Sequence, residues 1–216
     1  SLSGSLKKLI RKLIIFKHYL FTKYFFKFDD RKSLLAWQKK QLKKMLKVNL
    51  VKSKFYKDLE IKQFEALPLI DKTIMMANFD TINTVGVKKN EAFDLALKAE
   101  INRNFTPKLN NITIGLSSGT SGNRGIFLVN EKETLKWVGT ILAKTLPSNI
   151  FKKHKIAFFL RANSNLYKAI NSQNIKFLFF DLLKPVEEHF EELNKFGPSI
   201  LVAPPSMLRI LAQAKA

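Results

Sequence analysis

Three continuous apolar runs, each associated with a helical pattern, constrain the fold of this chain more than any other feature of its sequence. The runs are Lys155–Leu160, Ile175–Leu183 and Ser199–Ala203. Continuous rather than alternating apolar residues are typical of strands buried on both faces. Helices are expected over Asn165–Ser172, after Pro185 and from Ser206. Strands that alternate with helices predict an α/β fold in which βα units, from about residue 155, form part of a parallel sheet.

The segment before these units predicts a β-hairpin followed by a capped helix. Ile112–Leu116 and Gly125–Val129 are rich in β-branched and aromatic residues, as strands are. Asn130 and Glu133 have the spacing of a capping box for a helix that runs to about Leu146. Farther upstream, turn signals alternate with short helices, and we expect Asp71 to cap a helix through Met76.

Residues 6–28 predict an amphipathic basic helix, and a second helix is expected from Ser33 to about Asn49. The apolar residues of the first helix recur at helical spacing and are Leu6, Leu9, Ile10, Leu13, Leu20, Phe21, Tyr24, Phe25 and Phe28. Several lysines fall on the other side. Two interpretations stay open: the apolar stripe packs on the rest of the domain or on a second subunit, or it lies in an anionic membrane surface.

Composition excludes several classes of function. The chain has no Cys, and its three His are far apart in the sequence, so we expect no metal held by His and Cys. Its net charge is +21, but it carries 32 Lys against 6 Arg without an ordered Arg cluster, and we therefore expect no specific nucleic-acid partner. The carboxylates around His189 (Glu187, Glu188, Glu191 and Glu192) are interpreted as the solvent face of a helix whose buried face holds Val186, Phe190 and Leu193.

We expect a cytoplasmic location, because no signal peptide is visible and no apolar segment approaches the length that spans a bilayer. If the stripe of residues 6–28 meets lipid, the protein lies peripherally at the inner membrane face. Three βα units leave a sheet with an unfinished edge. We therefore expect the 216 residues to be the front portion of a longer protein.

The stretch Ser117–Gly125, SSGTSGNRG, concentrates three of the eight glycines between the two hairpin strands. Glycine allows positive φ and close approach of backbone N–H groups, which together bind anions. Hydroxyls at Ser117, Ser118, Thr120 and Ser121 add donors, and Arg124 adds a positive charge. It is not a Walker A loop, because no GK[ST] ends it and a strand follows. Spacing alone leaves two interpretations open, a phosphate-binding loop and an ordinary glycine-rich hairpin turn.

The sequence SSGTSG resembles the phosphate loop of the adenylate-forming enzymes, the superfamily of acyl-CoA synthetases, luciferases and peptide-synthetase adenylation domains. The chain is more similar to one branch, the phenylacetate-CoA-ligase-like and capsular-polysaccharide-biosynthesis-type putative adenylate-forming enzymes. The similar segments occur in the family's order from about residue 40 onward. They are SKFYKDL, LPLIDKTIMMANFD, GLSSGTSGNRGIFLV, KIAFFLRANSNLY, KFLFFDLL and ILVAPPSMLRILA.

The resemblance implies ATP-dependent adenylation of a carboxylate, followed in some members by transfer to a thiol such as CoA. It implies that the β- and γ-phosphates of ATP, usually with Mg²⁺, are held by Ser117, Ser118, Gly119, Thr120, Ser121, Gly122 and Arg124. Where many members read Lys-Pro-Lys-Gly after the loop, this chain has Asn123-Arg124-Gly125, so the position of its basic side chain differs.

Substrate contacts are expected after the strand that ends at Leu160. The resemblance places acyl-pocket residues there, and the candidates are Arg161, Asn163, Asn165 and Tyr167. Ligands of open α/β sheets bind at the carboxyl ends of strands, in agreement with this placement. The competing interpretation is a helix cap beside a surface arginine. No catalytic residue is assigned.

The family's later motifs do not occur in these 216 residues. We expect the Mg²⁺ ligands, the ribose-binding aspartate and the mobile C-terminal domain beyond residue 216, and we expect the chain alone to be inactive in adenylation. Residues 1–32 then form the basic N-terminal helix, and residues 33–216 form a partial N-terminal domain of an adenylate-forming enzyme. The alternative from another class is a non-catalytic, basic membrane-surface or scaffold protein that keeps this fold.

Overall fold

The computed structural model describes residues 4–57, 59, 64–117, 124–161 and 171–214. The chain is mixed α/β and divides into two compact units. Unit 1 comprises Ser1–Phe25, Ala99–Thr106 and Asn130–Ala216, and unit 2 comprises Phe26–Lys98 and Pro107–Val129. Each unit is therefore assembled from segments that are separate in the sequence.

The sheet of unit 1 contains three parallel strands, β3 (His154–Leu160), β4 (Ile175–Asp181) and β5 (Ile200–Val202), in the order β4-β3-β5. Ile156 of β3 pairs with Phe177 of β4 on one side and with Ile200 of β5 on the other. The predicted parallel arrangement is confirmed. Strand β5 is shorter than expected and stands at an edge of the sheet, where the side chain of Leu201 is 41 % exposed.

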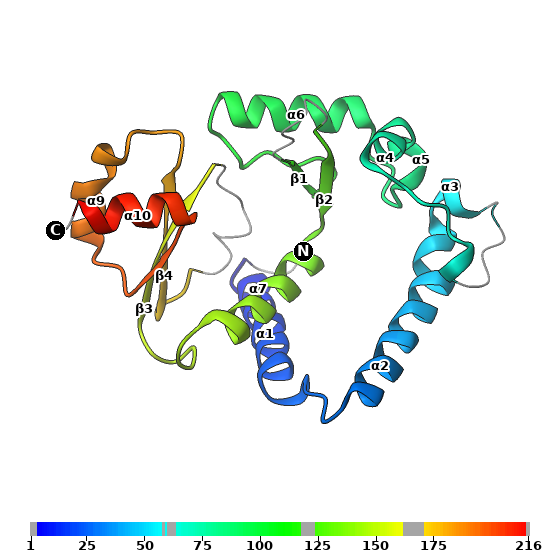
Figure 1. Cartoon of the computed structure of the whole chain (residues 1–216), viewed down its shortest axis with the longest axis horizontal. Coiled ribbons are helices and arrows are strands. Elements are labelled where there is room, and N and C mark those ends of the chain that lie inside the picture. The colour runs from blue at the N-terminus through cyan, green and yellow to red at the C-terminus, as the bar shows by residue number, and fades with distance from the viewer. Residues whose placement is uncertain (1–3, 58, 60–63, 118–123, 162–170, 215–216) are drawn as a thin grey trace. The chain divides into compact units, whose positions relative to one another are not determined.

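Helices cover both faces of this sheet, as predicted (Figure 1). On one face, Ile156 and Ile175 pack with Tyr19 of α1 (Gly4–Leu20) and with Val138 and Leu142 of α7 (Glu131–Thr145). The other face carries α9 (Phe190–Phe196) and α10 (Pro205–Gln213). The buried residues of this second core are Ala157, Phe159, Phe180, Met207 and Leu211. Successive strand residues point to opposite faces, so β3 contributes to both cores.

The face of α1 that packs is not the predicted apolar stripe. Tyr19 is 2 % exposed in the core, and Ile15 lies beside it, whereas Leu9 and Leu13 of the stripe are 53 % and 57 % exposed. Leu20 reaches the edge of the core. The predicted helix is confirmed over α1 and continues as a π-helical turn, η1 (Phe21–Phe25), but it ends three residues before the predicted end at Phe28. The interpretation in which the stripe packs on the domain is therefore wrong for most of its residues among those described.

Three caps set the starts of helices. Asp71 caps α4 (Lys72–Ala77) as predicted, its carboxylate accepting from the N–H of Ile74 at 2.7 Å. The capping box of α7 is also confirmed, since Asn130 and Glu133 bond reciprocally. The predicted start of the second helix is wrong. Because the carboxylate of Asp30 accepts from the N–H of Ser33 at 2.7 Å, α2 (Arg31–Lys44) begins earlier, and it continues into the π-helical turn η2 (Met45–Asn49).

Unit 2 holds the predicted hairpin, β1 (Thr113–Leu116) and β2 (Ile126–Val129), which pair antiparallel. Its other elements are α2, η2, η3 (Leu50–Lys52), α3 (Lys54–Lys57), η4 (Phe64–Ala66), α4, α5 (Phe79–Ile82) and α6 (Lys89–Ile101), although the last three residues of α6 belong to unit 1. The buried residues of its core are Phe79, Val87, Ala92, Ile112 and Ile126. The hairpin is thus anchored in this core by Ile112, directly before β1, and by Ile126, the first residue of β2.

The helix after β4 begins near a buried histidine that the sequence analysis did not assign to either face. His189 is 5 % exposed, its Nε2 donates to the carbonyl oxygen of Asp181 at 2.9 Å, and its ring meets Phe159 and Phe180 edge-on. The neighbouring glutamates are exposed as predicted, and the helix opens with a 3₁₀ turn, η5 (Val186–His189). Of the helix expected over Asn165–Ser172, residues 165–170 lie outside the described residues, and Asn171 and Ser172 are not helical.

Candidate functional site

Ser117 and Gly125 close the glycine-rich loop at the end of the hairpin. The N–H of Ser117 donates to the carbonyl oxygen of Gly125 at 2.8 Å, and the N–H of Gly125 donates to Oγ of Ser117 at 2.8 Å. Nε of Arg124 donates to the carbonyl oxygen of Ser117 at 3.0 Å. Oγ of Ser117 thus acts as an acceptor for Gly125, and a serine hydroxyl also carries one O–H donor.

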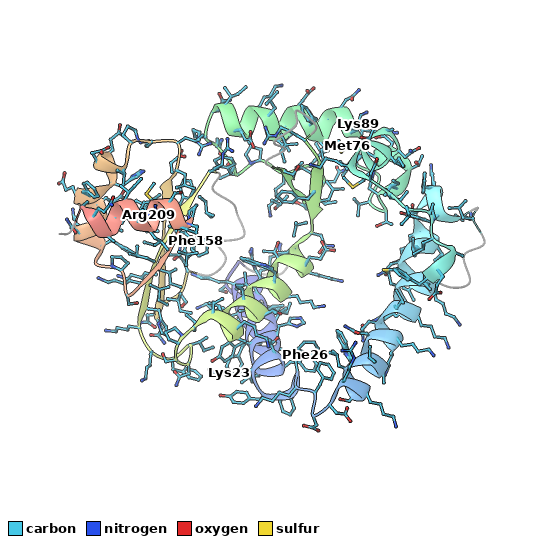
Figure 2. All side chains as sticks on the ribbon, in the orientation of Figure 1. Lys23, Phe26, Met76, Lys89, Phe158 and Arg209 are labelled. Carbon is cyan, nitrogen blue, oxygen red and sulfur yellow. The ribbon has the colours of Figure 1, made fainter. Side chains whose placement is uncertain are left out.

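A pocket of about 560 Å³ lies beside Arg124 within unit 2. Its walls come from α4, from α6 and from the loop exit, and its lining residues are Lys72, Thr73, Met76, Lys89, Asn90, Phe93, Asp94 and Arg124. Figure 2 labels Met76 of α4 and Lys89 of α6. The described lining thus combines three cationic side chains with one carboxylate, that of Asp94, and with polar donors and one aromatic ring. This composition favours an anionic ligand that also presents a flat or apolar surface.

Helix α4 is fixed against the exit of the loop. A β-carbon at Gly125 would lie 3.7 Å from Cε of Lys72 and 3.5 Å from Cε of Met75, so these side chains lie beside Gly125. Sδ of Met76 accepts from the N–H of Ile126 at 3.5 Å. The cap of Asp71 sets where α4 begins and therefore where the side chain of Lys72 leaves the backbone.

Asp80 holds the start of α6 on the other side of the pocket. Its carboxylate accepts from the N–H of Lys89 at 2.8 Å and forms an ion pair with Lys88 at 3.2 Å. The N–H of Lys89 is the larger cause that lowers the pKa of Asp80 below its ordinary value, and the contact with Lys88 adds to the shift. Asp80 therefore stays ionised and keeps Lys89 at the pocket.

The other predicted site lies at the carboxyl edge of the parallel sheet in unit 1. Arg161 follows β3 there and is exposed. Its carbonyl oxygen accepts from Nη2 of Arg103 at 2.6 Å, and the same Nη2 lies 2.5 Å from Oδ2 of Asp181, the last residue of β4. Arg103 has a φ of +52° and stacks over Phe105 at 5.1 Å. Arg103 thus ties together the ends of β3 and β4.

The described residues contain only part of the predicted site. Ser117 and Arg124 lie at the base of the loop, and Arg161 lies at the sheet edge. The other predicted residues (Ser118, Gly119, Thr120, Ser121, Gly122, Asn163, Asn165 and Tyr167) lie outside the described residues. Sequence reasoning missed Lys72, Lys89 and Arg103. For Lys72 the available signal was its place directly after the cap Asp71 in the segment LPLIDKTIMMANFD, and no comparable signal marked the other two.

Fold and site together define a mixed α/β protein with a basic, loop-bordered pocket. Comparisons with protein-family models, with curated proteins and with solved structures find no match to this chain. Across the described ranges, no three His, Cys, Asp or Glu side chains group so that they could hold a metal ion. Within the same ranges, no helix has the length and apolar character needed to cross a membrane.

Proposed function

We propose that this chain binds the β- and γ-phosphates of ATP at the glycine-rich loop while the α-phosphorus is attacked in the adenylation of a carboxylate. In that reaction a carboxylate oxygen attacks the α-phosphorus, the bond from this phosphorus to the bridging oxygen breaks, and pyrophosphate leaves. The resemblance of SSGTSG and its flanking segments to adenylate-forming enzymes supports this choice of reaction.

One observation carries the proposal: the loop is closed at its base next to a pocket lined by cations. Ser117 and Gly125 fix the two ends of the loop by a pair of hydrogen bonds. Lys72, Lys89 and Arg124 line the adjoining pocket and supply more positive charge than Asp94 offsets. A polyphosphate bound there exchanges water for charge-assisted hydrogen bonds, which are the stronger kind. Neutralising the charge of the departing pyrophosphate is the chemical assistance that such a site provides.

Direct titration of ATP and of inorganic tripolyphosphate into the protein tests the proposal. Because the net charge is +21, the protein attracts any polyanion. The test therefore needs a variant that distinguishes binding at the pocket from this general attraction. We expect Lys72→Gln/Arg124→Gln to weaken ATP binding by about tenfold or more, since charge-assisted hydrogen bonds contribute about 1.5–3 kcal/mol. The matched control is Lys39→Gln/Lys43→Gln on the exposed surface of α2, which removes the same charge.

Isothermal titration calorimetry at two salt concentrations distinguishes the outcomes. If ATP binds in the pocket, Lys72→Gln/Arg124→Gln loses more affinity for ATP than the α2 control does at both salt concentrations. Equal, modest losses in the two double variants would show that ATP binds only through the overall charge, and the proposal would then be wrong. The absence of ATP binding at low salt would reject it as well.

A further inference from the structure

The outer surface of α1 carries an apolar stripe that the core of unit 1 does not use. The side chains of Leu9, Ile10 and Leu13 are 53 %, 39 % and 57 % exposed, and with Leu6 they follow the spacing i, i+3, i+4, i+7. The opposite side of the helix, centred on Ile15 and Tyr19, packs on α7. The helix is therefore apolar on two opposite sides, and only one of them is buried.

The apolar surface continues beyond this stripe. Phe16 meets Phe151 of the loop before β3 edge-on, with ring centroids 6.3 Å apart, and Phe151 is 69 % exposed. At the end of the helix, Tyr24 and Phe25 of η1 are 55 % and 74 % exposed. Exposed leucine and aromatic side chains along one side are typical of helices that lie in the membrane interface. All of these residues belong to unit 1.

The charges around the α1 stripe indicate what kind of partner covers it. The segment from Gly4 to Phe25 carries six Lys and Arg residues and neither Asp nor Glu. On a helix of about 3.6 residues per turn, Lys7 and Lys12 border the stripe on opposite sides, and both are exposed. Lys152 and Lys153 follow Phe151 directly and are exposed too. A second copy of this surface would bring like charges together, whereas an anionic lipid surface complements them.

We propose that this surface, formed by the α1 stripe, η1 and Phe151, binds anionic membranes, with the helix lying in the plane of the interface. The leucines and aromatic rings enter the boundary between headgroups and acyl chains, and the bordering lysines extend to lipid phosphates. This inference does not depend on nucleotide binding, because none of its residues lines the pocket of unit 2.

Deleting the helix is not a clean test, because Tyr19 belongs to the core of unit 1. The test uses co-sedimentation with vesicles of equal parts phosphatidylglycerol and phosphatidylcholine, compared with vesicles of phosphatidylcholine alone. The first variant is Leu9→Asp/Leu13→Asp, and its control is Leu69→Asp/Ile101→Asp, which places the same charges at side chains that are 95 % and 70 % exposed. We expect the first variant to lose at least about tenfold in vesicle affinity relative to the control.

A second variant separates charge from apolar contact. Lys7→Gln/Lys12→Gln should weaken binding by about fivefold for each lysine at low salt and by less at high salt. Circular dichroism of each variant checks that it is folded. Equal binding by Leu9→Asp/Leu13→Asp and its control, or equal binding to the two kinds of vesicle, would overturn the proposal. A dimer in light scattering that Leu9→Asp/Leu13→Asp dissociates would assign the surface to a second copy instead.

Discussion

The carbonyl oxygen of Ile15 lies 2.5 Å from the point where a β-carbon on Gly139 would stand. Cβ of His18 is 2.7 Å from the same point. Only a residue without a side chain lets α1 approach α7 this closely, and this approach determines which side of α1 is buried. The side that carries Ile15 and Tyr19 enters the core, and the stripe of Leu9 and Leu13 faces outward.

Gly139→Ala should therefore destabilise unit 1. Overpacking of a tight contact costs about 1–3 kcal/mol, and this cost exceeds the gain of about 1 kcal/mol in helix propensity when alanine replaces glycine. Urea denaturation of the purified protein measures the change. Gly4→Ala is the control, because nothing lies within 4 Å of its β-carbon position. A Gly139→Ala protein as stable as the control would contradict the close contact.

Ser117→Ala should open the base of the loop without disturbing the core. The N–H of Gly125, a buried residue, loses its acceptor, and an unsatisfied buried donor costs about 1–3 kcal/mol. We expect faster hydrogen exchange of the Gly125 amide, measured by NMR, together with weaker tripolyphosphate binding. Ser117→Thr keeps the hydroxyl and serves as the control. Unchanged exchange in Ser117→Ala would show that the hydrogen bond does not hold the loop.

Arg103 and Asp181 should couple energetically at the edge of the parallel sheet. Their side chains are 31 % and 13 % exposed, so water screens the ion pair only in part. A double-mutant cycle with Arg103→Gln and Asp181→Asn is expected to give a coupling of about 1–2 kcal/mol in the free energy of unfolding. Lys184→Gln with Glu188→Gln is the comparison, because this pair is exposed and 3.9 Å long. Additive effects of the two changes at Arg103 and Asp181 would refute the coupling.

Acid should weaken unit 2 through Asp80. The pKa of this carboxylate is lowered, chiefly by the N–H of Lys89, so its contribution is fully present above the unfolded value of about 3.9. The contribution is lost as the pH falls through the lower folded pKa. We expect Asp80→Asn to be less stable than the unchanged protein at neutral pH, with a difference that shrinks below about pH 4. Urea unfolding across this range measures it, and a difference that stays constant with pH would reject the assignment.

Local interactions were predictable because they depend on residues a few positions apart. Asp71 bonds to the third residue after it, and Asn130 and Glu133 bond to one another across the same spacing. Asp30 was missed because Ser33, which is itself a good capping residue, stood closer to the apolar pattern. Continuous apolar runs likewise predicted parallel strands, since a strand covered on both faces has no reason to alternate.

The candidate site was predictable only in its loop. The spacing of Ser117 and Gly125 across the hairpin is local, and their bonding follows from the strand register. Lys72 and Lys89 belong to separate helices, and their side chains reach one pocket only because α4 and α6 line it together. Arg103 meets Asp181 over a separation of 78 residues, which no short pattern records.

The sequence by itself determined the hairpin, the parallel strands and the caps of α4 and α7, because caps, turns and apolar periodicity act over a few residues. Tertiary structure alone decided which of two apolar sides of α1 is buried. Both sides carry large aliphatic residues, Ile15 on one and Leu13 on the other, so hydrophobic burial favours neither clearly. The choice came from shape: Gly139 of α7 admits the backbone of α1 at one rotation of the helix, and the stripe was left at the surface.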